Sequence, residues 1–442
     1  MFPLARPYRQ ILMTGLLLLL AVLPTLYVLS TVWSIRRPGH VRDLEAELSQ
    51  TLGLQVTMDE VAYPRPGEIV VKGPIFRQEE PRRRGLVEIA RARSVRLRRG
   101  DRELVVETDG LRLRGESPKL AMAQLGVLLQ RPNDGSIDRV SLNAPSCELE
   151  FALDRLRYSI RDVAGTFQTD RSAPTLKASY RMVHGGASTR CELSLSRDRS
   201  AEPVRTSLVI KTMDGLPLPG RVLDVFIDSA DWIGKDARVE GALTLRQTGA
   251  KDWEAEFQGD LHDVDLGTLI GRRFPSQRLS GLAHLAVEDA KWGDRPGQGY
   301  GWIEARGELN TGQGSIGSSF LAALGSEMSF RVDQKVVGPG RGQPRLDMDF
   351  QALGLTFEIR PDGEIVLGGA LGTDYAPDAV IVHEGMTLAY APRGAANVRG
   401  LIKTLVPTRA TDPVMIPLTT ESRVLLCFPA PPQPRPKRIE GN

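Results

Sequence analysis

The chain has 442 residues, and its 57 Lys and Arg nearly balance its 54 Asp and Glu, giving a formal net charge of +3. This balance argues against a nucleic-acid-binding protein, which normally carries a strong basic excess, so we expect no nucleic-acid partner. Hydrophobic residues make up 41% of the chain and charged residues 25%, as in an ordinary folded body. The three cysteines are too few and too scattered for a disulfide framework or a zinc site.

Near the N-terminus, residues Gln10 to Ile35 include no charged side chain. As a helix, the apolar centre at 11–33 would span about 34 Å, enough to cross a hydrocarbon core of about 30 Å. The sequence therefore predicts a transmembrane helix at 10–35, after a short segment at 1–9. The competing interpretation is a cleaved signal peptide, whose apolar region is shorter, about 7–15 residues. Arginines flank the run on both sides, so the positive-inside rule does not decide the orientation.

Behind the predicted anchor, apolar and polar residues alternate over many short stretches. A period of two is typical of strands that bury one face and leave the other in water. The sequence predicts a mainly β fold with a few helices (α+β), built from long curved antiparallel sheets of the meander type. Among the alternating apolar positions of the first strands are Val95, Leu97, Leu104, Val106, Leu111 and Leu113.

Helical patterns interrupt the strands. Residues 40–53 place Val41, Leu44 and Leu48 at helical spacing. Residues 117–131 begin with a serine and a proline, which favour a helix start. A loop and helix at 312–328 and a last helix at 395–405 are expected in the second half.

The organisation expected from these patterns has two β-rich parts. The first covers 36–214 and the second covers 215–412. A C-terminal strand and a Pro-rich basic tail follow at 413–442. Within that tail, residues 428–442 have the composition of a disordered segment.

Three passages resemble the AsmA-like family of bacterial envelope proteins. They are the helix-to-strand opening Leu48–Val61 with Pro66–Gly73, the strands and turn of Val239–Leu245, Gly259–Leu269 and Leu279–Ala283, and the strand–turn Gly307–Gly317. The resemblance implies a single-pass anchor in the inner (cytoplasmic) membrane, a short cytoplasmic N-terminus and a periplasmic β-rich body. It also implies that an apolar groove carries phospholipid acyl chains.

The six alternating positions named above are the candidates for lining such a groove. If the sheet curves, their shared face becomes an apolar trough, where shielding an acyl chain is favourable by about 0.8 kcal/mol per CH₂. The alternative is that the same residues fill an ordinary closed core.

The most conspicuous charge feature is a group of arginines in the first strands. Near a membrane, each basic residue can contribute about 1 kcal/mol of attraction to anionic headgroups. The alternative is a solvated outer face with ion-pair partners such as Glu103 and Glu107. The headgroup-contact candidates are Arg91, Arg93, Arg96 and Arg98.

Nothing in the sequence predicts catalysis. His262 and Asp265 have a spacing that a metal could use, but Asp265 better suits a helix cap, so we expect no catalytic, metal or cofactor site. Cys147 and Cys191 fit either a disulfide or buried thiols. The sequence-based hypothesis is a non-enzymatic protein that assists lipid transport or envelope homeostasis. The alternative is a structural or assembly protein of the envelope, for secretion or outer-membrane biogenesis, that binds protein partners.

Overall fold

The computed structural model describes residues 37, 39–52, 54–80, 85–115, 129, 137–151, 156–214, 216–225, 229–249, 252–295, 299–333, 347–372, 374–406 and 428. The predicted anchor at 10–35, the C-terminal segment apart from residue 428, and the predicted helix at 117–131 apart from Leu129 lie outside these ranges. Among the described helices, none has both the length and the apolar character needed to span a bilayer.

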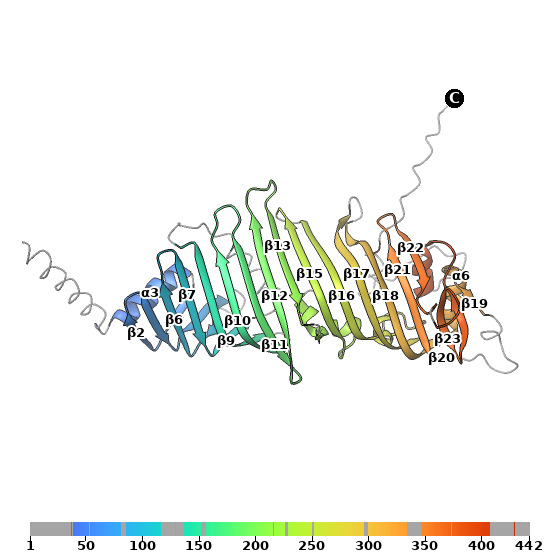
Figure 1. Ribbon diagram of the computed structural model, residues 1–442, viewed down its shortest axis with the longest axis horizontal. Helices are drawn as coiled ribbons and strands as arrows, with labels where there is room; N and C mark the ends of the chain where they lie inside the picture. Colours follow the sequence, from blue (N-terminus) through green and yellow to red (C-terminus); the bar gives the residue numbers. More distant parts are fainter. Residues whose placement is uncertain are drawn as a thin grey trace, which may run out of the picture.

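The described part of the chain is mainly β, as predicted, and its 25 strands belong to one sheet. Its middle is an antiparallel meander in which long neighbouring strands follow each other along the chain (Figure 1). These strands are β9 (Arg139–Phe151), β10 (Leu156–Gln168), β11 (Thr175–His184), β12 (Ala187–Asp198), β13 (Arg205–Thr212), β15 (Arg238–Thr248), β16 (Asp252–Asp265), β17 (Leu279–Arg295) and β18 (Gly299–Gly317). The short β14 (Leu218–Pro219) pairs with the start of β15.

The sheet divides in two at its N-terminal end. The first half of β9 pairs with β7 and the second half with β8, and one branch continues through β6, β3 and β2, the other through β5, β4 and β1. The strands are β1 (Gln55–Thr57), β2 (Glu60–Arg65), β3 (Glu68–Lys72), β4 (Ile75–Glu80), β5 (Gly85–Arg91), β6 (Ser94–Arg99), β7 (Glu103–Asp109) and β8 (Leu111–Gly115).

Both pairings with β9 are parallel, which corrects the expectation of a purely antiparallel meander. Parallel neighbours need a crossover of a dozen or more residues, and residues 116–138 between β8 and β9 are long enough. Helix α3 (His40–Leu52), predicted at 40–53, packs at this end of the sheet. Its Val41, Leu44 and Leu48 contact a cluster that includes Val56 and Val71.

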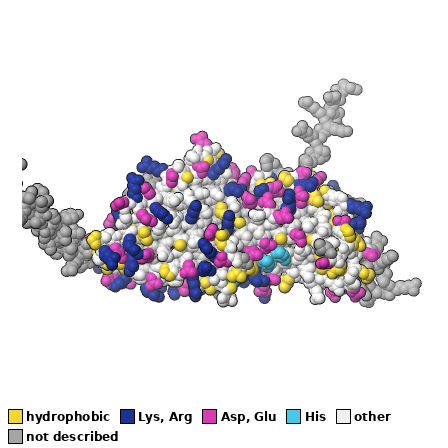
Figure 2. Space-filling view, viewed as in Figure 1, with side chains coloured by type: hydrophobic (Ala, Val, Ile, Leu, Met, Phe, Trp, Pro, Cys, Tyr) yellow, Lys and Arg dark blue, Asp and Glu magenta, His cyan; other side chains and the backbone are white. Residues whose placement is uncertain are grey.

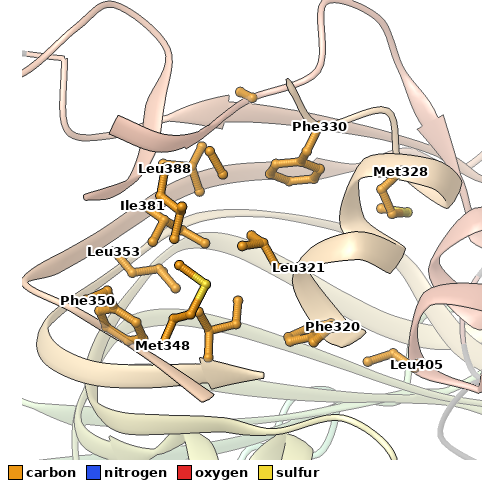
Figure 3. Close-up of a cluster of buried hydrophobic side chains, with 14 of the residues drawn as sticks. Phe320, Leu321, Met328, Phe330, Met348, Phe350, Leu353, Ile381, Leu388 and Leu405 are labelled. Carbon is orange, nitrogen blue, oxygen red and sulfur yellow. The ribbon is translucent and has the colours of Figure 1, made fainter. Parts of the chain in front are cut away.

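The C-terminal end contains the largest buried core. β18 pairs with both β20 and β21, and helices α6 (Ser318–Glu327) and α8 (Val398–Leu405) pack against the strands beyond. Leu321 points from α6 towards Met348 and Ile381 (Figure 3). These strands are β19 (Arg331–Val332), β20 (Asp347–Phe350), β21 (Ala352–Ile359), β22 (Glu364–Gly369), β23 (Ala379–His383), β24 (Met386–Tyr390) and β25 (Ala396–Asn397).

The helix expected at 312–328 begins later than predicted. Residues 314–317 extend β18 and pair with β20, with Gly314 opposite Phe350, and α6 starts only at Ser318. Local sequence could not reveal this, because the partner strand lies about 30 residues further along the chain.

Three short helices lie at the middle of the sheet: η2 (Gly220–Val225), α5 (Ser229–Ile233) and η3 (Gly267–Gly271). Val222 and Leu223 pack with Met182 and Val239, while Ile233 packs with residues of β16 and β17. Like α3, α6 and α8, they cover the face of the sheet that carries the apolar residues. We call this face the inner face.

Candidate functional site

The strand registers place an unbroken line of apolar residues across the inner face, at right angles to the strands. It passes through fourteen strands, from β3 to β22, and each member lies directly opposite the next. At about 4.8 Å per strand the line is roughly 60 Å long. This central row consists of Ile69, Leu97, Val106, Leu142, Gly165, Ala178, Leu193, Ile210, Leu243, Phe257, Ala290, Ala305, Ile359 and Ile365.

A second row lies beside the central row, two residues away on each strand except β18. It crosses ten strands from β7 to β18 and is also apolar throughout; on β18 a register shift places its member, Trp302, three residues from Ala305. Its members are Leu104, Val140, Phe167, Leu176, Leu195, Leu208, Leu245, Ala255, Trp292 and Trp302. We call the two rows together the apolar track.

Much of the track is only half-buried. Leu193, Ile210, Leu243 and Phe257 keep part of their surface accessible although they lie near the middle of the sheet. In a sheet sandwich, an opposing sheet would bury such residues in a core about 10 Å thick. The strands that the structure describes form a single hydrogen-bonded sheet, and they leave these four residues partly accessible.

The ends of the central row differ from its middle. Ile69 packs in the cluster beneath α3, and Ile365, at 3% exposure, packs in the core beneath α6 and α8. The half-exposed part of the track therefore lies between two helix-covered ends.

Leu129 is an aliphatic side chain that packs on the second row of the track. It is only 2% exposed and packs with Leu195 and Leu208 of the second row. Arg199 Nη2 donates a hydrogen bond of 2.6 Å to the backbone carbonyl oxygen of Leu129. An aliphatic group from outside the sheet is thus buried on the track.

The six sequence-predicted groove candidates lie on the inner face. Leu97 and Val106 belong to the central row and Leu104 to the second row. Leu111 and Leu113 lie opposite Cys147 and Leu149 on β9. Val95 lies opposite Val71 on β3.

Of the track, sequence reasoning named only Leu97, Leu104 and Val106, and it did not recognise strands β10, β11 and β12. The signal was present in β12, where Cys191, Leu193 and Leu195 alternate with Glu192 and Ser194. Hydrogen-bonded pairing then aligns this alternation with that of each neighbouring strand.

The outer face is polar, and charged side chains of both signs are interspersed over it (Figure 2). Arg96 Nε lies 3.2 Å from a Glu68 carboxylate oxygen, and Arg98 pairs with Glu107. The hydrogen bond from Arg98 holds the pKa of Glu107 below its usual value. The other two candidate arginines also have carboxylate partners: Arg91 pairs with Glu88 at 3.0 Å, and Arg93 pairs with Asp109 at 3.1 Å.

Two histidines of neighbouring strands stack on the outer face. The His262 and His284 rings stack with centroids 4.8 Å apart, beside a cleft of about 270 Å³. Each Nε2 faces a carboxylate, at 3.1 Å from Glu240 and 2.9 Å from Asp260 respectively. Within the described ranges, no three His, Cys, Asp or Glu side chains are grouped as metal ligands.

Asp265 is not the helix cap expected from the sequence, because the N-cap of η3 is Leu266, the next residue. The Asp265 carboxylate accepts hydrogen bonds from the Gly267 backbone N–H at 2.9 Å and from the Thr268 hydroxyl at 2.7 Å. Both bonds lie at the start of η3 and hold the chain where β16 ends.

Cys147 and Cys191 are both buried free thiols, so of the two interpretations the disulfide is the wrong one. They lie on β9 and β12, with β10 and β11 between them. At about 4.8 Å per strand, this separation exceeds the reach of a disulfide. Burial raises the pKa of each thiol to about 11.

Comparison of the chain with protein-family models, with curated proteins and with solved structures gave no match.

Proposed function

We propose that the protein is an AsmA-like, membrane-anchored periplasmic protein that assists lipid transport or envelope homeostasis by accommodating acyl chains on the apolar track. The observation that carries this proposal is the unbroken apolar row across fourteen strands, whose middle members Leu193, Ile210, Leu243 and Phe257 are only half-buried. A surface of this length left in water is costly, at about 25 cal/mol per Å² of apolar area. A ligand that covers it therefore gains free energy.

The shape of the track favours acyl chains over a compact ligand. The track is roughly 60 Å long, about four times the thickness of one hydrocarbon leaflet, since a bilayer core measures about 30 Å. Apart from the indole N–H groups of Trp292 and Trp302, its side chains are neither polar nor charged, so it offers few directional contacts of the kind a small polar substrate needs. Leu129 supports the same conclusion, because the track already buries one alkyl side chain.

The anchor and the compartment belong to this proposal through the resemblance and the apolar run at 10–35. Helix α3 begins at His40, a few residues beyond that run. The first strands and their arginines would then lie close to the membrane surface.

Site-specific photocrosslinking in cells tests the proposal with the full chain. A benzophenone amino acid at Leu193 on the inner face is compared with one at Ser194, the next residue on the same strand, which faces outward. We expect phospholipid adducts at position 193 and few at 194, read by mass spectrometry. Predominantly protein adducts at 193 would instead support the assembly-protein alternative, and equal lipid labelling at both positions would refute binding on the track.

A further inference from the structure

Three of the five tryptophans gather at one place on the inner face. Trp292 of β17 lies opposite Trp302 of β18, with ring centroids 5.2 Å apart and the rings nearly perpendicular. Ala255 of β16 lies opposite Trp292. Trp253 lies two positions before Ala255 on the same strand, so the two residues share the inner face. The Trp253 side chain is 47% exposed. We call Trp253, Trp292 and Trp302 the aromatic lip.

The aromatic lip is where the second row of the track ends. Trp292 and Trp302 are the last two members of that row, and Trp302 packs with Ala290 and Ala305 of the central row. Beyond β18, the pairing with β21 begins at Ala305. Among the described strands, residues 299–304 therefore have no partner on that side, and the second row runs out at a strand edge.

This end of the track differs from the ends of the central row. Those ends pack beneath α3 and beneath α6 and α8. At the aromatic lip, the cluster around Trp302 consists of residues from β16, β17, β18 and β21, with no residue from a described helix.

Basic side chains on the strands of the aromatic lip already have carboxylate partners. On the outer face of the same strands, Arg246 pairs with Glu256 at 2.9 Å, and Lys291 lies 3.0 Å from Asp289 and also pairs with Glu304. A partner that docks here therefore gains little from charge. It gains from contact with indole rings, whose apolar body and N–H donor suit the boundary between hydrocarbon and water.

We propose that the aromatic lip is a docking surface for a lipid–water interface, through which acyl chains pass between a membrane and the apolar track. This inference rests on the proposed function, and it adds where the lipid enters and leaves. Because Arg246 and Lys291 are already paired with carboxylates, the docking does not depend on attraction to anionic headgroups and is insensitive to salt.

Tryptophan fluorescence with brominated lipid tests this inference. The full chain carries Trp33→Phe and Trp232→Phe, so that only the aromatic lip emits, and is held in nanodiscs of unbrominated lipid. Vesicles of brominated phosphatidylcholine are then added, and vesicles of the unbrominated lipid serve as control. We expect the brominated vesicles alone to quench most of the emission, equally at low and high salt. The anchor cannot cause this signal, because its own bilayer contains no bromine.

A pair of variants separates a role of the aromatic lip from general damage. Trp253→Asp places a charge on the aromatic lip, whereas Gln258→Asp places one on the outer face of the same strand, opposite Ala242. We expect Trp253→Asp to slow the uptake of fluorescent phosphatidylcholine from vesicles severalfold, while Gln258→Asp leaves the rate unchanged. Equal rates in both variants would overturn the inference.

The remaining outcomes are also decisive. If brominated vesicles leave the emission unchanged while Leu193 still crosslinks lipid, the aromatic lip is not the docking surface, although the proposed function stands. If neither lipid signal appears, the proposed function fails as well. Emission that changes with protein concentration in the absence of vesicles would show that a second copy of the chain covers the aromatic lip, which also overturns the inference.

Discussion

Leu193 of β12 lies directly opposite Ile210 of β13 on the inner face, while the adjoining pair on the same two strands, Ser194 and Val209, faces outward. The two pairs have the same strand neighbours and similar backbone geometry. They differ in the face of the sheet that they occupy. They therefore provide a matched inner and outer position for testing the apolar track.

The first prediction concerns a charge placed on the track. Replacing Leu193 by Asp should sharply lower the phospholipid that co-purifies with the full chain, because an acyl chain would have to desolvate the new carboxylate. Ser194→Asp should leave the bound lipid unchanged. The measurement is quantitative lipid mass spectrometry per mole of protein.

A folding control accompanies this comparison. Thermal unfolding should show that both variants still fold, with Leu193→Asp less stable than Ser194→Asp because Leu193 packs against the buried cluster of Leu129, Leu195 and Leu208. Equal lipid loss in the two variants, or none in either, would contradict binding on the track.

The second prediction concerns the arginines of the first strands. If they contact headgroups, Arg96→Ala and Arg98→Ala should each weaken binding to anionic vesicles about fivefold, since one basic residue near the surface contributes about 1 kcal/mol. The effect should disappear at high salt, where screening is short-ranged. Vesicle co-sedimentation measures the binding.

Arg360 provides the control for this experiment. It is also ion-paired, 3.2 Å from Glu358 and 3.3 Å from Glu364, but it lies beyond β21 at the other end of the sheet. Arg360→Ala should leave vesicle binding unchanged. An equal loss in this variant would mean that total charge, and not position near the anchor, governs binding.

The mainly β fold could be predicted from the sequence because the alternation of apolar and polar residues within a strand is a local signal. Alternation within a single strand, as at Val95 and Leu97, reveals which face is apolar without knowledge of any neighbour. The same holds for α3, where helical spacing and the bounds of the helix agree closely.

Local sequence patterns could not predict that the apolar track is continuous across the strands. It depends on the register of each pair of strands, which places Leu193 opposite Ile210 and Leu243 opposite Phe257. A shift of one residue in a register would move the apolar side chains of that strand to the other face. The aromatic lip has the same origin, since its tryptophans lie up to 49 positions apart in the chain and become adjacent through strand pairing. The parallel pairing of β7 and β8 with β9 likewise has no local signature.

The third prediction tests the register through a pair of glycines. Gly241 and Gly259 lie opposite each other with φ of +130° and +150°. A Cβ on Gly259 would lie 2.1 Å from the Glu240 carbonyl oxygen. Gly259→Ala should therefore lower stability by about 2–4 kcal/mol, from overpacking and an unfavourable φ.

Gly312 is the matched control for that substitution. It lies in β18, and a Cβ there would meet no atom within 4 Å, so Gly312→Ala should change stability little. Thermal unfolding followed by circular dichroism compares the two variants. Similar unfolding temperatures would show that β15 and β16 do not approach as closely as described.

The last prediction concerns the buried thiols Cys147 and Cys191. Burial raises the pKa of each to about 11, above the ordinary value of about 8.5, so the folded protein holds these protons more tightly than the unfolded chain. The resulting stabilisation is complete below about pH 8.5 and is lost as the pH rises towards 11.

In a Cys427→Ser background, both thiols should resist iodoacetamide at pH 8 until guanidinium unfolds the chain. Adding Cys147→Ala and Cys191→Ala should flatten the fall in unfolding temperature between pH 8.5 and 11. Rapid alkylation of the folded protein at pH 8 would contradict the burial of these strands.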